Sequence, residues 1–155
     1  MVYGWIIGAL AGLDLMAKET VEQQPAEEFP RDLPWAKGRI RLYRNQNKGF
    51  PFGTLAGRPE LVRTLPLMMA SALAGALGAL LGRKDAFWER LGLAVVLGGA
   101  VSNIYDRLKR GYVVDYFSIQ WKGLKKVVFN LGDIFIFAGG LMVLAAQMVK
   151  SLRED

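Results

Sequence analysis

Residues 127–149 read VVFNLGDIFIFAGGLMVLAAQMV, an apolar stretch in which Asp133 is the one charged residue. The stretch has the length that a helix needs to cross a hydrocarbon core of about 30 Å. Two more stretches of similar length and apolar character cover about residues 61–81 and 86–105. Each of the three therefore predicts a transmembrane helix.

A shorter apolar stretch runs from about Val2 to Ala17. A secretory signal is the competing interpretation, but the stretch lacks a basic n-region and a small-residue cleavage site followed by a soluble domain. We expect a retained first span that continues a little past Lys18. The chain is then predicted to be an all-α membrane protein with four transmembrane helices, forming a single domain over residues 1–155.

Small residues mark the second and third stretches. Gly75, Gly78 and Gly82 lie at helical spacing in or just after the second, and Gly98 and Gly99 are adjacent in the third. Small residues let neighbouring membrane helices approach closely. We expect these glycines to face other helices.

Residues 19–60 form the one long polar stretch, acidic at its start and basic towards its end. Residues 38–43 partly alternate, with Ile40 and Leu42 apolar, which predicts a short strand or hairpin. Residues 45–49, NQNKG, are typical of a turn. A small β-like or loop element is therefore expected between the first and second spans.

The amino-acid composition excludes several kinds of active site. The chain has no cysteine and no histidine, which rules out thiol nucleophiles, thiolate metal sites, Ser-His-Asp triads and imidazole bases. A hydrolase with this composition must rely on Asp, Glu, Lys, Ser or Tyr. We expect no cofactor and no metal.

The net charge of +6 resides mostly in loops that flank apolar stretches. Anionic phospholipid headgroups are the expected partner for such bases. Nucleic acid is not expected, because no basic stripe alternates with exposed aromatic residues. Lys and Arg number eight in the first loop, three in the second, six in the third and two in the C-terminal tail. By the positive-inside rule, this count places both termini outside the cytoplasm.

Three acids lie beside or inside the apolar stretches: Asp106, Asp115 and Asp133. An ionisable residue at bilayer depth costs roughly 2.5–3.5 kcal/mol and is by default a candidate functional group. Two carboxyl groups that converge in a water-poor site share one proton, because both cannot ionise cheaply. This pattern favours acid–base hydrolysis. The alternative for Asp115 and Asp133 is an ion pair with a neighbouring Arg or Lys that stabilises a helix end.

Five short polar patches lie along the chain. The first four contain Asp14 with Lys18; Asn47 with Gly49 and Phe52; Asn103 with Asp106 and Arg107; and Gly111 with Val113 and Asp115. The fifth contains Phe129, Asn130 and Asp133. In this order, the patches resemble the motifs of signal peptidase II, the lipoprotein signal peptidase family. The chain departs from the family pattern at Phe50, Pro51, Tyr116 and Gly132, where the family has two small residues, Phe and Ala.

The resemblance implies that Asp115 and Asp133 are the catalytic pair of an intramembrane aspartic endopeptidase. Its substrates would be diacylglyceryl-modified prolipoproteins, cut before the lipidated cysteine. The remaining matched residues would bind substrate or support the site: Asp14, Lys18, Asn47, Gly49, Asn103, Asp106, Arg107 and Asn130. It also implies a monomer crossing the bacterial inner membrane several times, with an extracytoplasmic β-like element and both termini cytoplasmic. That orientation conflicts with the charge count.

Two other functions fit the same residues. A catalytically weak paralogue would bind lipopeptide or lipid without cutting it, and Gly132 and the Phe50–Pro51 pair motivate that alternative. A proton-coupled carrier would use the acids as a relay. The carrier is less favoured, because four spans without an inverted repeat leave little machinery for alternating access.

Overall fold

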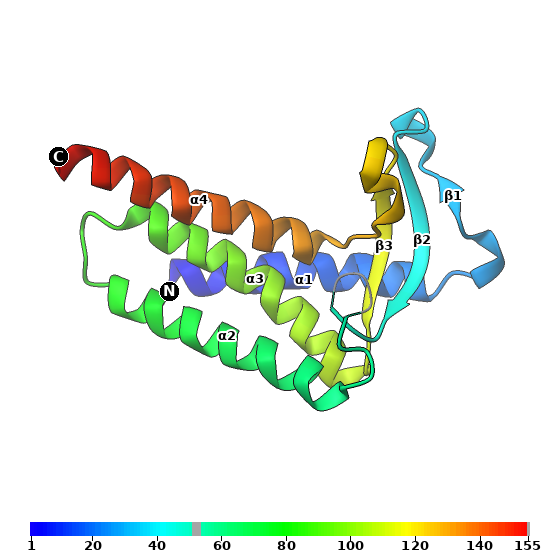
Figure 1. The fold of residues 1–155 in the computed structure, drawn as a ribbon, viewed down its shortest axis with the longest axis horizontal. Helices are drawn as coiled ribbons and strands as arrows, with labels where there is room; N and C mark the ends of the chain where they lie inside the picture. The colour runs from blue at the N-terminus through cyan, green and yellow to red at the C-terminus, as the bar shows by residue number, and fades with distance from the viewer. Residues whose placement is uncertain (51–53, 155) are drawn as a thin grey trace.

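A computed structural model describes residues 1–50 and 54–154 of the chain. Its four long helices lie alongside one another, with both termini and the α2–α3 turn at one end and a small sheet at the other (Figure 1). The helices are α1 (Val2–Glu22), α2 (Pro59–Leu80), α3 (Phe87–Lys109) and α4 (Leu131–Glu154). Short 3-10 segments are η1 (Ala26–Glu28), η2 (Pro34–Ala36) and η4 (Lys122–Lys126). The prediction of four helices is confirmed.

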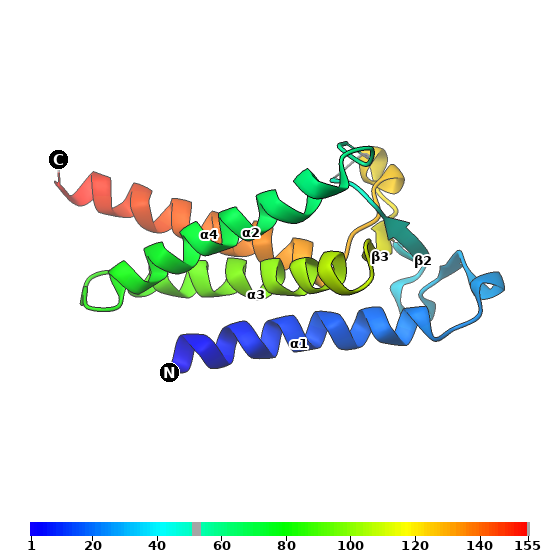
Figure 2. The same ribbon diagram turned by 90° about the horizontal axis from the view of Figure 1, so that it is seen from below.

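Helix α3 lies in the middle and packs against α1, α2 and α4 (Figure 2). It approaches α4 where Gly99 lies against the carbonyl of Gly132, so closely that no Cβ fits at position 99. The expectation of close packing at Gly98 and Gly99 is therefore confirmed. That for Gly75, Gly78 and Gly82 is wrong, because a Cβ at any of these positions would meet no atom of the described residues within 4 Å. Helix α2 packs against α3 and has no comparable contact with α1 or α4, so these glycines have no neighbouring helix beside them.

Among the described residues, two helices are long and apolar enough to cross a membrane, Pro59–Leu80 and Leu131–Arg153. Both expose most of their apolar side chains, including Met68 on α2 and Phe137 and Leu144 on α4. This pattern suits lipid contact better than burial in a soluble core. Helices α1 and α3 carry charged residues of both signs, including Asp14 and Lys18 on α1 and Asp106 and Arg107 on α3. That all four helices span the membrane remains a prediction.

A three-stranded antiparallel sheet shows that the all-α prediction is wrong in part. Its strands are β1 (Arg31–Asp32), β2 (Ile40–Asn47) and β3 (Val113–Ile119), in that order. The predicted strand over 38–43 is present, but the turn predicted from residue 45 begins too early, because β2 continues to Asn47. The third strand comes from the segment between α3 and α4 and was not predicted.

The pairing of β2 with β3 explains both errors. Asn45 lies opposite Asp115 and Asn47 opposite Val113, with an irregularity in the register between Leu42 and Asn45. The partner strand holds the polar residues of β2 in extended conformation, which local turn propensity does not anticipate.

The fourth helix begins at Leu131 rather than Val127, also because of the sheet. Phe129 forms an isolated antiparallel bridge with Phe117, in which its N–H donates to the Phe117 carbonyl at 2.7 Å. The segment before α4 is therefore extended against β3. This arrangement brings the first turn of α4 beside the strand that carries Asp115.

Candidate active site

Asp115 lies on β3, almost fully buried, and is held by two asparagine side chains. The Asn130 amide donates to Oδ1 at 2.8 Å, and the Asn47 amide donates to Oδ2 at 3.1 Å. Burial raises the pKa of Asp115 to about 7, and the negative charge of Asp133 adds to the increase. Asp115 is thus a carboxyl group that exchanges its proton near neutral pH.

Asp133 lies in the first turn of α4, where local sequence explains its placement. The Asn130 side-chain oxygen accepts the Asp133 N–H at 2.9 Å, and the Asp133 carboxylate accepts the Asn130 N–H at 3.2 Å. This reciprocal pair satisfies two of the free N–H groups at a helix start, as in a capping box. Asn103 of α3 donates to the other carboxylate oxygen at 3.0 Å.

One cavity of about 830 Å³ is lined by both carboxylates. Its polar wall also includes Asn47, Asn103 and Arg107, and its apolar wall includes Phe129, Ile136 and Phe137. The cavity lies where the ends of α3 and α4 meet the sheet. It therefore offers two acids, several amide groups and an apolar surface to one ligand.

The ion-pair alternative does not describe these two acids. Within the part of the chain that the structure describes, neither Asp115 nor Asp133 forms a salt bridge, and both accept hydrogen bonds from amide groups. Lys109 and Arg110, the bases nearest to Asp115 in sequence, lie at the end of α3, and Arg110 pairs with Glu19 and Asp106 instead. A buried carboxyl group without a cation is costly to ionise.

Lys18 anchors a fully buried network behind the cavity. Its ammonium lies 2.8 Å from Asp14 Oδ2 and 3.3 Å from Asp106 Oδ2. It also donates to Ser102 Oγ at 3.0 Å and to Asn103 Oδ1 at 2.7 Å. One cation therefore connects α1 to the residues of α3 that face Asp133.

Asp106 and Arg107 are adjacent in sequence but have different partners. Asp106 Oδ2 accepts the Val114 N–H at 3.0 Å, which ties the end of α3 to β3. Arg107 donates to the carbonyl of Asn103 at 3.2 Å and to that of Gly49 at 3.4 Å. The cations closest to Asp106 are thus Lys18 and Arg110, not the neighbouring Arg107.

The segment after β2 completes the site. Asn47 Oδ1 accepts the Gly49 N–H at 3.0 Å, which orients the Asn47 amide towards Asp115. Through Arg107, Gly49 is joined to α3. The structure brings together all ten site residues that the sequence singled out. Phe52 and Pro51 lie outside the described residues.

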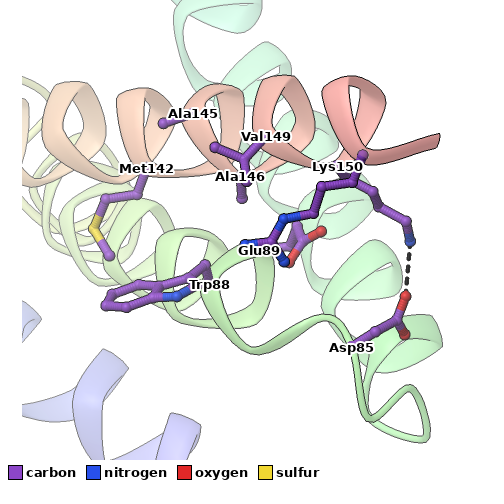
Figure 3. A pocket seen from close by; sticks show the side chains of 9 residues that line it. Asp85, Trp88, Glu89, Met142, Ala145, Ala146, Val149 and Lys150 are labelled. Atoms are coloured by element: carbon purple, nitrogen blue, oxygen red, sulfur yellow. Dashed lines mark hydrogen bonds and ion pairs between the residues drawn. The ribbon is translucent and has the colours of Figure 1, made fainter. Parts of the chain in front are cut away.

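A second cavity, of about 470 Å³, lies between α3 and α4 at the far end of the helices (Figure 3). Trp88 and Met142 line it, and Lys150 pairs with Asp85 at 2.8 Å at its edge. Its charged groups are remote from the two carboxylates. Across residues 1–50 and 54–154, no group of three or more His, Cys, Asp or Glu residues has the arrangement of a metal site.

The sequence of the chain is similar to those of known proteins. The profile of signal peptidase II matches residues 6–149. A lipoprotein signal peptidase of Haemophilus ducreyi is 32% identical over 155 residues, covering 97% of this chain and 94% of the relative. One from Trichormus variabilis is 36% identical over 119 residues, covering 77% and 73%. The chain belongs to the signal peptidase II family.

The fold agrees with that family assignment. A solved bacterial membrane enzyme structure superposes with a TM-score of 0.80 at 19% identity, covering 99% of this chain and 92% of that one. A second superposes with a TM-score of 0.73 at 20% identity, covering 94% and 92%. The chain is therefore a member of a family of membrane proteases, with the same overall fold as a bacterial membrane enzyme.

Two residues of the buried network, Ser102 and Tyr116, were not among the predicted site residues. Ser102 is fully buried and donates to Asp14 Oδ2 at 2.5 Å while accepting from Lys18. In the sequence, only the position of Ser102 immediately before Asn103, within an apolar helix, indicated that it could belong to the site. A lone serine in a helix usually bonds to its own backbone, so the signal was weak.

Proposed function

We propose that this chain is an intramembrane aspartic endopeptidase that removes the signal peptide of diacylglyceryl-modified prolipoproteins, with Asp115 and Asp133 as the catalytic pair. The observation that carries the proposal is the placement of a buried carboxyl group, Asp115, and a partly buried one, Asp133, on one cavity, both held by amides and free of ion pairs among the described residues. The names of the curated relatives support the substrate class, since they are lipoprotein signal peptidases.

The reaction needs one proton between the two carboxyl groups. Asp133, as the carboxylate, takes a proton from a water molecule whose oxygen attacks the scissile carbonyl carbon. Asp115, neutral because of its raised pKa, donates its proton to the carbonyl oxygen. When the C–N bond breaks, the leaving amine takes the proton that Asp133 received, and a hydroxyl of the tetrahedral intermediate returns a proton to Asp115 as the carbonyl re-forms.

The other site residues position these groups. Asn130 contacts both acids and fixes their relative placement. Asn47 donates to Oδ2 of Asp115, and Asn103 donates to Oδ1 of Asp133. Arg107 and the apolar wall with Phe129 and Phe137 face the space in which substrate lies. Apolar side chains there suit the acyl chains of a lipid-modified peptide.

The proposed arrangement in the bacterial inner membrane has four spans and both termini in the cytoplasm. Asn47, Asp106 and Asp115 then lie at the outer side, where a translocated lipoprotein presents its cleavage site. The end of the molecule with the sheet is accordingly the outer end (Figure 1). The protein works as a monomer in contact with phospholipid, without nucleic acid or a cofactor.

Cleavage of a diacylglyceryl-modified peptide by the purified protein tests the proposal. Asp115→Asn and Asp133→Asn should each fold and lose nearly all hydrolysis. The double variant should be hardly worse than either single one, because each change breaks the same proton-sharing pair. Asp85→Asn is the matched control, since this exposed aspartate pairs with Lys150 at the other end of the molecule.

Binding without cleavage is the outcome that would favour the second candidate function. Gly132 in place of alanine motivates it, because this position adjoins Asp133. A wild-type protein that binds the lipopeptide but releases no signal peptide would be a lipopeptide-binding paralogue. Loss of activity in Asp85→Asn equal to that in Asp115→Asn would also overturn the assignment of the catalytic pair.

A further inference from the structure

Two departures from the family pattern, Tyr116 and Gly132, meet at one buried carboxylate. They are 16 residues apart, on β3 and in the first turn of α4. The Tyr116 hydroxyl donates to Asp14 Oδ1 at 3.1 Å. A Cβ at Gly132 would lie 2.9 Å from Asp14 Oδ2. Tyr116 thus provides a hydrogen-bond donor to Oδ1 of Asp14, and the missing side chain of Gly132 leaves space for Oδ2.

The Tyr116 hydroxyl has a second partner that leads to the active site. It accepts the N–H of Leu131 at 3.1 Å. Leu131 is the first residue of α4, where backbone N–H groups lack partners within the helix. Burial and the Asp14 charge raise the pKa of Tyr116, so its hydroxyl keeps its proton and stays a donor to Asp14. A phenylalanine would make neither hydrogen bond.

Asp14 cannot move away from an added methyl group without cost. It is fully buried, and besides Tyr116 it accepts from Ser102 at 2.5 Å and pairs with Lys18 at 2.8 Å. A Cβ at position 132 would also lie 3.0 Å from Asn130 Oδ1 and 3.0 Å from the Gly99 carbonyl. Asn130 Oδ1 is the atom that accepts the Asp133 N–H.

We propose that Tyr116 is a positioning residue that ties Asp14 on α1 to the first turn of α4, and that Gly132 provides the space on which this contact depends. Asp133 lies two residues after Leu131, so the tie holds the turn that carries one acid of the pair. The two departures are a coupled change rather than two independent losses. This inference rests on the proposed function, in which Asp133 is catalytic.

A double-mutant cycle tests the coupling with Tyr116→Phe, Gly132→Ala and both together. Tyr116→Phe should lower kcat by about 5-fold with KM within about twofold, because a positioning contact is lost and substrate contacts are kept. Gly132→Ala should lower kcat by about 10-fold or more. In the double variant the Asp14 carboxylate keeps Ser102 and Lys18 but loses the restraint of the tyrosine on Oδ1, so it can rotate further from the methyl group. Its kcat should therefore exceed that of Gly132→Ala alone.

Tyr112→Phe is the matched control. This change removes a hydroxyl that donates to Glu22 at 2.9 Å, close to β3 but away from Asp14. It should leave kcat unchanged. Losses that simply multiply in the double variant, or an equal loss in Tyr112→Phe, would overturn the proposal. If Gly132→Ala does not yield folded protein, the kcat of Tyr116→Phe is compared with that of Tyr112→Phe. A lower kcat in Tyr116→Phe supports the positioning role, and equal values overturn it.

The thermal unfolding midpoints of the four proteins of the double-mutant cycle, the wild type included, separate this inference from the proposed function. If the wild-type protein cleaves no lipopeptide, the proposed function fails. A midpoint that is higher in the double variant than in Gly132→Ala would still support the coupling at Asp14. Additive shifts in the midpoint would overturn it, whatever the activity.

Discussion

Lys18 Nζ lies 2.7 Å from Asn103 Oδ1, so the amide nitrogen of Asn103 faces Asp133, to which it donates at 3.0 Å. An ammonium group only donates hydrogen bonds. Its contact with Asn103 is therefore favourable only when the amide oxygen, and not the amide nitrogen, faces Lys18. A lysine on α1 thus determines which group of α3 meets a carboxylate on α4.

Replacing Asn103 separates the two contacts of its amide. Asn103→Ala should lower kcat by about 10- to 100-fold, because a hydrogen bond to a charged group is lost. Asn103→Asp keeps an acceptor for Lys18 but has no donor for Asp133, and it adds a negative charge beside it. We expect Asn103→Asp to be the less active of the two in peptide cleavage. An Asn103→Asp protein as active as wild type would show that contact with Lys18 alone matters.

The raised pKa of Asp115 predicts how stability depends on pH. The group has a pKa of about 7 in the folded protein and near 3.8 when unperturbed, so the folded state holds this proton more tightly. Its contribution to stability is full below about pH 4 and is lost as pH rises to about 7. Asp115→Asn should therefore stabilise the protein at pH 8, by up to about 4 kcal/mol, and much less at pH 5.

Thermal or denaturant unfolding in detergent at several pH values checks this prediction. Asp85→Asn is the control with the opposite sign, because the hydrogen bond from Lys150 lowers the pKa of Asp85. That variant should lose stability, not gain it, above about pH 4. Equal effects of Asp115→Asn at pH 5 and pH 8 would show that Asp115 does not titrate in this range.

Asp106 should prove structural and not catalytic. Its carboxylate contacts Lys18, Arg110 and the Val114 N–H, and none of these contacts is to the other two acids. Asp106→Asn should lower the free energy of unfolding by about 1–3 kcal/mol, because a buried charge pair is weakened, and should retain measurable turnover. An Asp106→Asn protein that folds and binds lipopeptide normally but is as inactive as Asp115→Asn would contradict the assigned pair.

Single cysteines can resolve the conflict over orientation, because the chain has none of its own. Gly57 lies just before α2 and Gly123 in η4, and both are exposed; these segments are at the end of the molecule with the sheet. Gly82, in the α2–α3 turn, and Ser151, near the end of α4, are exposed in segments at the opposite end (Figure 1). A cysteine at either of the first two positions should react with a membrane-impermeant reagent added outside intact cells. One at either of the other two should not. The reverse pattern would support the orientation given by the charge count.

Sequence alone predicted the four helices and the residues of the candidate site. The stretch 127–149 predicts a helix because its apolar length is a local property, and helical hydrogen bonds join residues four apart. The polar patches marked Asp115 and Asp133 because acids beside long apolar stretches are rare. The resemblance to the family selected the five motif patches, and the structure brings their described residues together at one end of the helices. Part of the patch of Asn47, Gly49 and Phe52 lies outside the described residues.

The tertiary structure alone decided what these residues touch. Asn47 reaches Asp115 because β2 pairs with β3 across 68 residues of sequence, and this pairing turned predicted turn and loop residues into strand. Lys18 has its i+4 neighbour Asp14 as one partner, which the sequence indicates, and Asp106, Ser102 and Asn103 as the others, which it does not. Strand pairing and the choice among buried partners depend on which elements pack together, and that is settled by the free energy of the whole assembled fold rather than by any one segment.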